Sequence, residues 1–273
     1  MLTKERQPRP HPLNGDFRWV DRIVPLRRLT AEQRDAFNAH GFIKVEGAFT
    51  PGEIAAVTAA IDPLEAIGEQ QLRAAGGTIS ISTADAITFT THLVKRSAVL
   101  RDFAGHPFIR DVCHDLFGDD VRLYWDQSVY KKTGKIQEFP WHQDNGYTFI
   151  EPQQYLTLWL PLVDVDEENG CPWIAPGLHR GGTLDHWATP IGLKCLETAE
   201  DAVAVPAKAG DAIIFSSLSP HRTGPNLKLG SVRKAYILQY CHDGSIATLR
   251  DGTRVAQDDP ARQFRILAGG APV

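Results

Sequence analysis

The chain has 273 residues, of which 42% are hydrophobic and 23% are charged, and its formal net charge is −4. These values are typical of a soluble globular protein with one large, well-packed core. Because the charge is mildly acidic and the basic residues are scattered, neither nucleic acid nor an anionic membrane is an expected partner.

The first part of the chain predicts an irregular arm over residues 1–28, which contain four prolines and no apolar run typical of a signal peptide or membrane span. Capping-box patterns at Thr30 and Thr50 predict that helices begin immediately after them. The helix after Thr30 is expected to end near His40, and a short strand is expected at 42–45.

Residues 66–100 follow neither the helical nor the strand period clearly. We expect them to form an irregular lid or a segment that contacts substrate, and His92 lies within it. A further helix is expected at about 107–116, where apolar residues recur on one face.

From residue 121 onward the sequence is typical of short strands separated by turns. The strands are expected at 121–130, 155–163, 171–175, 202–205, 212–215 and 232–241. Helices followed by many strands predict a mainly β fold with flanking α-helices, namely a double-stranded β-helix (a cupin-like jelly roll) buttressed by N-terminal helices.

The domain organisation follows from the same pattern, because no repeat or linker interrupts it. One domain is expected over 29–273. Its parts would be helical support and a lid at about 29–118, the jelly-roll core at about 119–242 and a C-terminal tail at 243–273.

The strand at 155–163 has two different faces. Leucines at alternate positions predict a face packed on the core, and the residues between them, Tyr155, Thr157 and Trp159, predict a face that lines a cavity. An ordinary core position for Trp159 is an equal alternative.

A candidate metal site begins at His142 and Asp144, which lie two residues apart in a stretch that reads as a strand. Side chains at such spacing point to the same side of a strand, so both can reach one ion. His221 follows a later strand. Two imidazoles and one carboxylate are the ligand set of non-heme Fe(II) oxygenases.

Arg233 is expected on the next strand, with Ala235, Ile237 and Gln239 on the same face. A guanidinium directed into such an interior requires an anionic partner, and arginine is suited to holding a carboxylate with two hydrogen bonds. A structural ion pair with an acidic residue of the chain is the alternative.

These residues form part of a longer resemblance. The stretches FPWHQD (139–144), LWLPL (158–162), ENGC (168–171), PGLHR (176–180) and PHRTG (220–224), together with Arg233, resemble the phytanoyl-CoA dioxygenase family. The resemblance covers roughly 30–242. It implies an Fe(II)- and 2-oxoglutarate-dependent oxygenase on a double-stranded β-helix, which uses O₂, hydroxylates a small molecule and releases succinate and CO₂.

The resemblance also implies roles for individual residues. His142, Asp144 and His221 would bind Fe(II), Arg233 and Thr223 would bind the distal carboxylate of 2-oxoglutarate, and Trp159 would line the cosubstrate pocket. Lys131 and Gln127 are further candidates, although the family's Lys-Pro-Pro-Gly reads KKTG here, which leaves the role of Lys131 open. Halogenating relatives lack the carboxylate, so Asp144 favours hydroxylation.

Several alternatives stay open. A non-oxidative cupin-like metal enzyme, a zinc hydrolase or a catalytically inactive ligand-binding member of the fold could carry the same ligands. The first two would leave Arg233 unexplained, and the intact ligand set together with Arg233 argues against the third. His179 is expected to have a structural role.

Widely spaced cysteines without a CxxC pair favour the cytoplasm. The substrate and the choice between monomer and homodimer are not determined. Residues 66–92, 131–138 and 181–200 are expected to select the substrate, and Trp187 and the 243–265 tail are candidates to close over the site.

Overall fold

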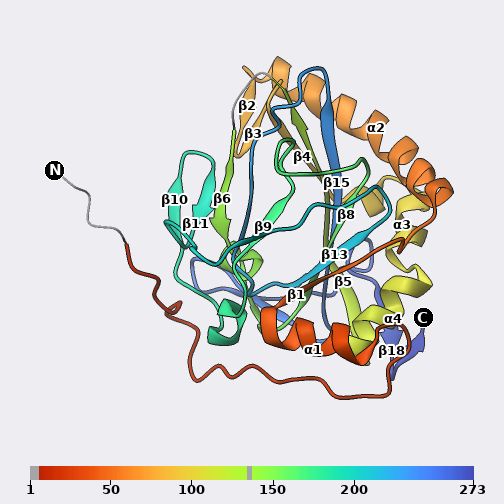
Figure 1. Ribbon diagram of the computed structural model, residues 1–273, viewed down its shortest axis with the longest axis vertical. Helices are drawn as coiled ribbons and strands as arrows, with labels where there is room; N and C mark the ends of the chain where they lie inside the picture. Colours follow the sequence, from red (N-terminus) through yellow and green to blue (C-terminus); the bar gives the residue numbers. More distant parts are fainter. Residues whose placement is uncertain (1–5, 134–136) are drawn as a thin grey trace.

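The computed structural model describes residues 6–133 and 137–273, and its centre is a pair of β-sheets (Figure 1). The larger sheet has ten strands, and its main path runs β1-β13-β8-β15-β5-β4-β3-β2, with β18 beside β5 and β19 beside β18. Its strands are β1 (Phe42–Val45), β2 (Thr78–Ile79), β3 (Ser82–Thr83), β4 (Ile87–Thr91), β5 (Val121–Lys132), β8 (Leu156–Pro161), β13 (Ala212–Ser216), β15 (Val232–His242), β18 (Arg265–Ala268) and β19 (Ala271–Pro272).

The smaller sheet has the order β12-β9-β14-β6 and packs against one face of the larger one. Its strands are β12 (Val203–Ala204), β9 (Pro172–Ile174), β14 (His221–Thr223) and β6 (Phe139–His142). Two small sheets flank this pair, β10 (Trp187–Thr189) with β11 (Gly192–Lys194), and β17 (Arg254–Ala256) with β16 (Ile246–Thr248) and β7 (Phe149–Glu151). The predicted jelly roll, mainly β with flanking helices, is confirmed.

Helices cover the other face of the larger sheet (Figure 1). They are α1 (Ala31–His40), α2 (Pro51–Ala74), α3 (Ala98–Ala104) and α4 (Pro107–Leu116). Leu156, Leu158 and Leu160 of β8 join the core between this sheet and the helices, whereas Trp159 packs between the two sheets. The predicted alternation is therefore confirmed for the leucines and Trp159, but it is wrong for Tyr155, which precedes β8 and joins the core with the leucines. The site that β8 lines must lie on the side away from the helices.

The prediction of an irregular segment at 66–100 is wrong. Helix α2 continues to Ala74, and β4 pairs with β5 over its whole length. The buried face of α2 includes Glu65 and Glu69, and Thr88 of β4 donates a hydrogen bond to Glu65 (2.6 Å). Because this interface pairs polar side chains, it lacks the hydrophobic period on which the prediction depended.

The tail is also regular, since β18 extends the larger sheet and β16 pairs with β7. Neither the tail nor Trp187 lines the cavities described below, within the part of the chain that the structure describes. The 131–138 loop lies partly outside the described residues. Every helix in the described ranges is too short or too polar to span a membrane.

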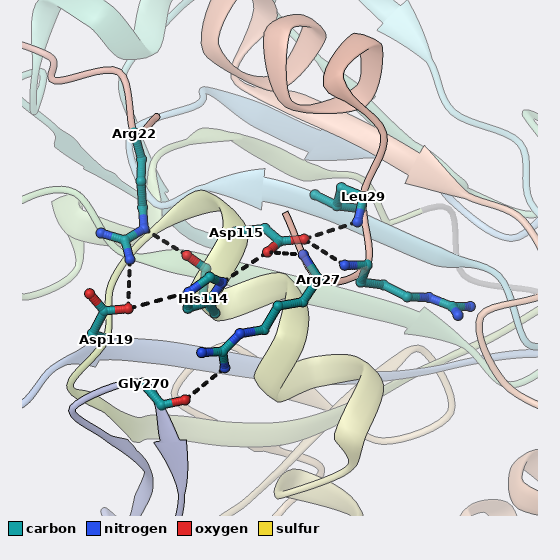
Figure 2. Close-up of polar contacts among 8 residues, drawn as sticks. Arg22, Arg27, Leu29, His114, Asp115, Asp119 and Gly270 are labelled. Atoms are coloured by element: carbon teal, nitrogen blue, oxygen red, sulfur yellow. Dashed lines mark hydrogen bonds and ion pairs between the residues drawn. The ribbon is translucent and has the colours of Figure 1, made fainter. Parts of the chain in front are cut away.

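The N-terminal arm is fastened to α4 by Asp115, whose side chain is fully buried (Figure 2). Its carboxylate accepts hydrogen bonds from the backbone N–H groups of Arg27 (2.8 Å), Arg28 (2.9 Å) and Leu29 (2.9 Å). Arg27 in turn donates to the carbonyl of Gly270 (2.7 Å). One acid therefore holds the chain just before α1 against the helical layer.

We expect Asp115→Ala to lower the free energy of unfolding by about 3 kcal/mol, because it leaves buried backbone donors without an acceptor. Chemical denaturation would measure this change, with Asp102→Ala, an exposed acid of α3, as the control. An equal effect of the two substitutions would contradict the anchoring role.

Candidate active site

His142 and His221 are brought together by strand pairing in the smaller sheet. His142 is the last residue of β6, His221 is the first residue of β14, and the two are cross-strand partners. Their ring centroids are 4.1 Å apart. Two histidines that lie 79 positions apart in the sequence thus become neighbours through one antiparallel ladder.

Asp144 reaches these imidazoles from a short 3₁₀ helix, η2 (Asp144–Gly146), and not from the strand. The prediction that His142 and Asp144 share one strand is therefore wrong, because the ladder ends at His142. Gln143 between them remains extended (φ −106°, ψ 144°), which keeps both side chains on one side. Oδ1 of Asp144 lies 3.8 Å from Nε2 of each histidine.

The chemistry of these three side chains fits a metal ion. Their ligand atoms all lie within 4.8 Å of one another. Nδ1 of His142 is 2.8 Å from the carbonyl of Pro140 and Nδ1 of His221 is 3.0 Å from that of Ser219, so each ring donates there and leaves Nε2 free to coordinate. Burial, together with His221, holds the pKa of His142 well below its usual value. Two neutral nitrogens and one carboxylate suit Fe(II).

A second layer of side chains orients the ligands. Thr157 of β8 donates a hydrogen bond to Oδ2 of Asp144 (2.5 Å), which leaves Oδ1 facing the histidines. The side chain of Gln143 is fully buried, accepts from the N–H of Leu184 (2.6 Å) and donates to the carbonyl of Gly182 (3.0 Å). The sequence indicated a cavity position for Thr157 but no contact with Asp144, because that contact joins the two sheets.

We expect Thr157→Val to weaken metal binding by about 10- to 100-fold, the usual effect of losing a hydrogen bond to a ligand. Competition with a chelator would measure the affinity, and Thr157→Ser should restore most of it because serine keeps the hydroxyl. Equal losses in the two variants would show that Thr157 acts through packing alone.

Arg233 lies in a narrow cavity that also contains the three candidate ligands. Its side chain is 1% exposed, and Nη1 donates to the carbonyl of Val129 (3.2 Å), while Nε and Nη2 have no partner. Among the described residues, no carboxylate forms an ion pair with it, so the structural ion pair is not found. Burial lowers the pKa of Arg233 to about 9, so the guanidinium is still charged at neutral pH.

Three of the other predicted cosubstrate residues line the cavity around this guanidinium, and one does not. Trp159, Thr223 and Gln127 line the same narrow cavity, and the centre of the Arg233 guanidinium lies 5.4 Å from the Trp159 ring centroid. Lys131 is the cross-strand partner of Arg233 but does not line the cavity. Its Nζ donates to Oγ1 of Thr223 (2.8 Å) and to the carbonyl of Gly224 (2.7 Å), which places Lys131 behind Thr223.

A wider cavity of about 450 Å³ adjoins the narrow one and shares His142, Asp144 and Gln127 with it. Its lining includes residues of the segment that was difficult to interpret from sequence, namely Ile79, Ser80, Ile81, Ser82, Phe89 and Thr91. Tyr147 and Gln239 also line it, and neither was a predicted site residue. Gln239 could have been found, because it lies on the same strand face as Arg233.

The remaining histidines of interest lie outside the site. His179 is buried, with Nε2 3.2 Å from the carbonyl of Asn38 and its ring edge-on to Trp19. The ring of His92 packs against Trp125 with centroids 4.4 Å apart, and it is Trp125 that lines the wide cavity. His179 therefore has the structural surroundings expected of it.

A set of two imidazoles and one carboxylate between the sheets of a jelly roll, beside an unpaired arginine, is the arrangement of the non-heme iron, 2-oxoglutarate-dependent oxygenases. The chain belongs to one family of that class. Residues 37–235 match the profile of the family described as Phytanoyl-CoA dioxygenase (PhyH).

The comparisons with individual proteins agree with this assignment. A probable phytanoyl-CoA dioxygenase of Caenorhabditis elegans is 27% identical over 161 residues, which cover 53% of this chain and 51% of that protein. The chain thus spans about half the length of such curated relatives.

Solved structures show the same fold. EctD from S. alaskensis, crystallised with 2-oxoglutarate and 5-hydroxyectoine, has a TM-score of 0.64 at 23% identity, with 89% of this chain and 87% of that chain covered. The non-heme alpha ketoglutarate-dependent carbocyclase SnoK from nogalamycin biosynthesis has a TM-score of 0.65 at 22% identity, with 80% and 86% covered.

Proposed function

We propose that this chain is an Fe(II)- and 2-oxoglutarate-dependent dioxygenase that hydroxylates a carbon atom of a small molecule. The observation that carries the proposal is the position of Arg233 in the same cavity as the candidate ligands, where this buried cation has no carboxylate partner among the residues that the structure describes. A non-oxidative metal enzyme with the same ligands would have no use for this cation.

The residues then have distinct roles. His142 and His221 would hold Fe(II) through Nε2, and Asp144 would hold it through one carboxylate oxygen. Arg233 would bind the distal carboxylate of 2-oxoglutarate, with the hydroxyl of Thr223 beside it. When bound, iron and 2-oxoglutarate supply the activation of O₂, and succinate and CO₂ are released.

The rest of the chain positions and shields these groups. Trp159 and Gln127 line the narrow cavity, as do Ile87, Phe215 and Ile237, which are apolar and keep water away from the cosubstrate. Lys131 would hold Thr223 in place without touching the cosubstrate. The wide cavity would then hold the substrate with the carbon to be oxidised beside the metal. As the family resemblance implies, Asp144 favours hydroxylation over halogenation.

The proposal also covers the domain organisation of the protein and its cellular location. We infer that residues 29–273 act as one domain. All four cysteines are buried and unpaired, which is usual in a reducing compartment, and we therefore place the protein in the cytoplasm.

Two measurements test this function in sequence. Anaerobic addition of Fe(II) and 2-oxoglutarate should produce the charge-transfer absorbance of a chelated 2-oxo acid. Admission of O₂ should then yield succinate, coupled to product once a substrate is present. Metal binding without any O₂ consumption would favour a non-oxidative metal enzyme, and absence of metal binding would favour an inactive ligand-binding member of the fold.

A further inference from the structure

The wide cavity has aromatic walls. Among the described residues that line it there is no lysine or arginine, and its one carboxylate is Asp144, which the metal site uses. Aromatic rings contribute from several sides, those of Phe89, Tyr124, Trp125, Phe139 and Tyr147. The walls therefore offer flat apolar surfaces and no counter-charge for an ionic ligand.

Two of these walls are phenol rings. Burial raises the pKa of Tyr124 well above the usual value. The hydroxyl of Tyr147 accepts a hydrogen bond from the backbone N–H of Leu193 (3.0 Å), which fixes its ring between this cavity and the β10–β11 hairpin. Both rings thus serve as walls.

One polar side chain in the cavity lacks a partner. Gln239 is 7% exposed, lines the cavity, and its side-chain amide makes no hydrogen bond with any described residue. Its amide is still accessible from the cavity, so a ligand group that pairs with it takes the place of water. Gln239 is therefore placed to recognise a group of the substrate.

A second amide lies diagonally across the strands. Trp125 is the cross-strand partner of Gln239, and its Nε1 donates to Oε1 of Gln127 (3.1 Å). This contact occupies the carbonyl of Gln127, so its NH₂ group is the part left to donate into the cavity. Gln239 can donate and accept, so the pair offers both kinds of hydrogen bond beside the metal site.

We propose that the substrate of this site is an uncharged small molecule with a flat apolar body and a hydroxyl, carbonyl or amide group that pairs with Gln239. The inference rests on the proposed function and names the class of substrate for it. Away from the metal, a carboxylate, a phosphate or an ammonium group in this cavity would lose its hydration without gaining a counter-ion from any described lining residue. Its aromatic rings favour stacking with a flat body.

Four matched probes test the proposal, namely 2-naphthylmethanol, 2-naphthamide, 2-naphthoate and 2-naphthylmethylamine. Their binding is measured by calorimetry on protein loaded anaerobically with Fe(II) and saturating 2-oxoglutarate, so that naphthoate cannot occupy the cosubstrate site. The neutral pair should bind at least about 10-fold more tightly than the charged pair. A preference for either charged probe, equal affinities, or no binding of the neutral pair would overturn the proposal.

Variants of Gln239 give an independent readout. Gln239→Leu should weaken binding of 2-naphthamide by about 5- to 10-fold and leave binding of naphthalene itself unchanged, because only the amide group loses a partner. Gln239→Glu should instead improve binding of 2-naphthylmethylamine. Gln71→Leu, an exposed position on α2, is the matched control. If neither Gln239 variant changes the order of affinities, the assigned role of Gln239 is wrong.

The same samples distinguish this inference from the proposed function. The charge-transfer absorbance of Fe(II) with 2-oxoglutarate depends on the metal ligands and Arg233, not on Gln239. Loss of that absorbance signals failure of the proposed function. A normal absorbance with a preference for charged probes signals failure of the substrate class alone.

Discussion

Arg233→Met is expected to raise the 2-oxoglutarate concentration for half-saturation by at least about 30-fold, because removing one partner of a buried charge pair costs about 2–5 kcal/mol. Metal affinity should stay nearly unchanged, because Arg233 does not contact the candidate ligands. Titration of 2-oxoglutarate under anaerobic conditions would measure the first effect, and chelator competition would measure the second.

The same substitution should make the protein without ligands more stable. In the free protein Arg233 is a buried charge whose Nε and Nη2 have no partner, so methionine of similar length removes a desolvated cation. We expect the free energy of unfolding to rise by about 1 kcal/mol or more, while the stabilisation that 2-oxoglutarate gives the native protein is lost.

Arg254→Met is the matched control for Arg233→Met. Its side chain is 60% exposed and pairs with Glu151 on the surface, so neither stability nor 2-oxoglutarate binding should change measurably. If Arg233→Met kept normal 2-oxoglutarate binding, the anion site would have to lie elsewhere. If Arg233→Met lowered the stability of the protein without ligands, Arg233 would have a structural role.

Asp144→Ala is expected to reduce the affinity for Fe(II) by at least about 100-fold. It removes one of three ligands and the only negative charge among them, and a neutral two-nitrogen site holds Fe(II) weakly. Equilibrium dialysis with metal analysis would measure the affinity. Asp258→Ala, an exposed acid without a side-chain contact among the described residues, should leave it unchanged.

The Asp144 and Arg233 variants separate the two halves of the site. At limiting Fe(II), Asp144→Ala should lower the charge-transfer absorbance at every 2-oxoglutarate concentration, whereas high 2-oxoglutarate should partly restore it in Arg233→Met. Unchanged Fe(II) affinity in Asp144→Ala would mean that the metal does not bind between the sheets.

The residues of the candidate site come from both sheets. His142 and His221 belong to the smaller sheet, while Thr157, which orients Asp144, and Arg233 belong to the larger one. A metal bound to Asp144 is therefore linked to both layers. Metal binding should accordingly stabilise the packing of the two sheets as well as the site itself.

The sequence by itself determined the jelly roll and pointed to His142, Asp144, His221 and Arg233 as the candidate site. Each of these depends on local or chemical properties: alternation along a strand, turn residues between strands, the donor atoms that iron prefers, and the need of a buried guanidinium for an anion. Such properties can be read without knowing which strands pair.

Only the tertiary structure decided which residues surround these groups. Strand β4 was missed because its partner helix presents buried glutamates, so the usual hydrophobic period is absent. Lys131 lies behind Thr223, Thr157 orients Asp144, and Gln239 is left without a partner, because strand register and the packing of two sheets place them there. These contacts join segments that are distant in the chain, and the period of one strand carries no information about the register of another.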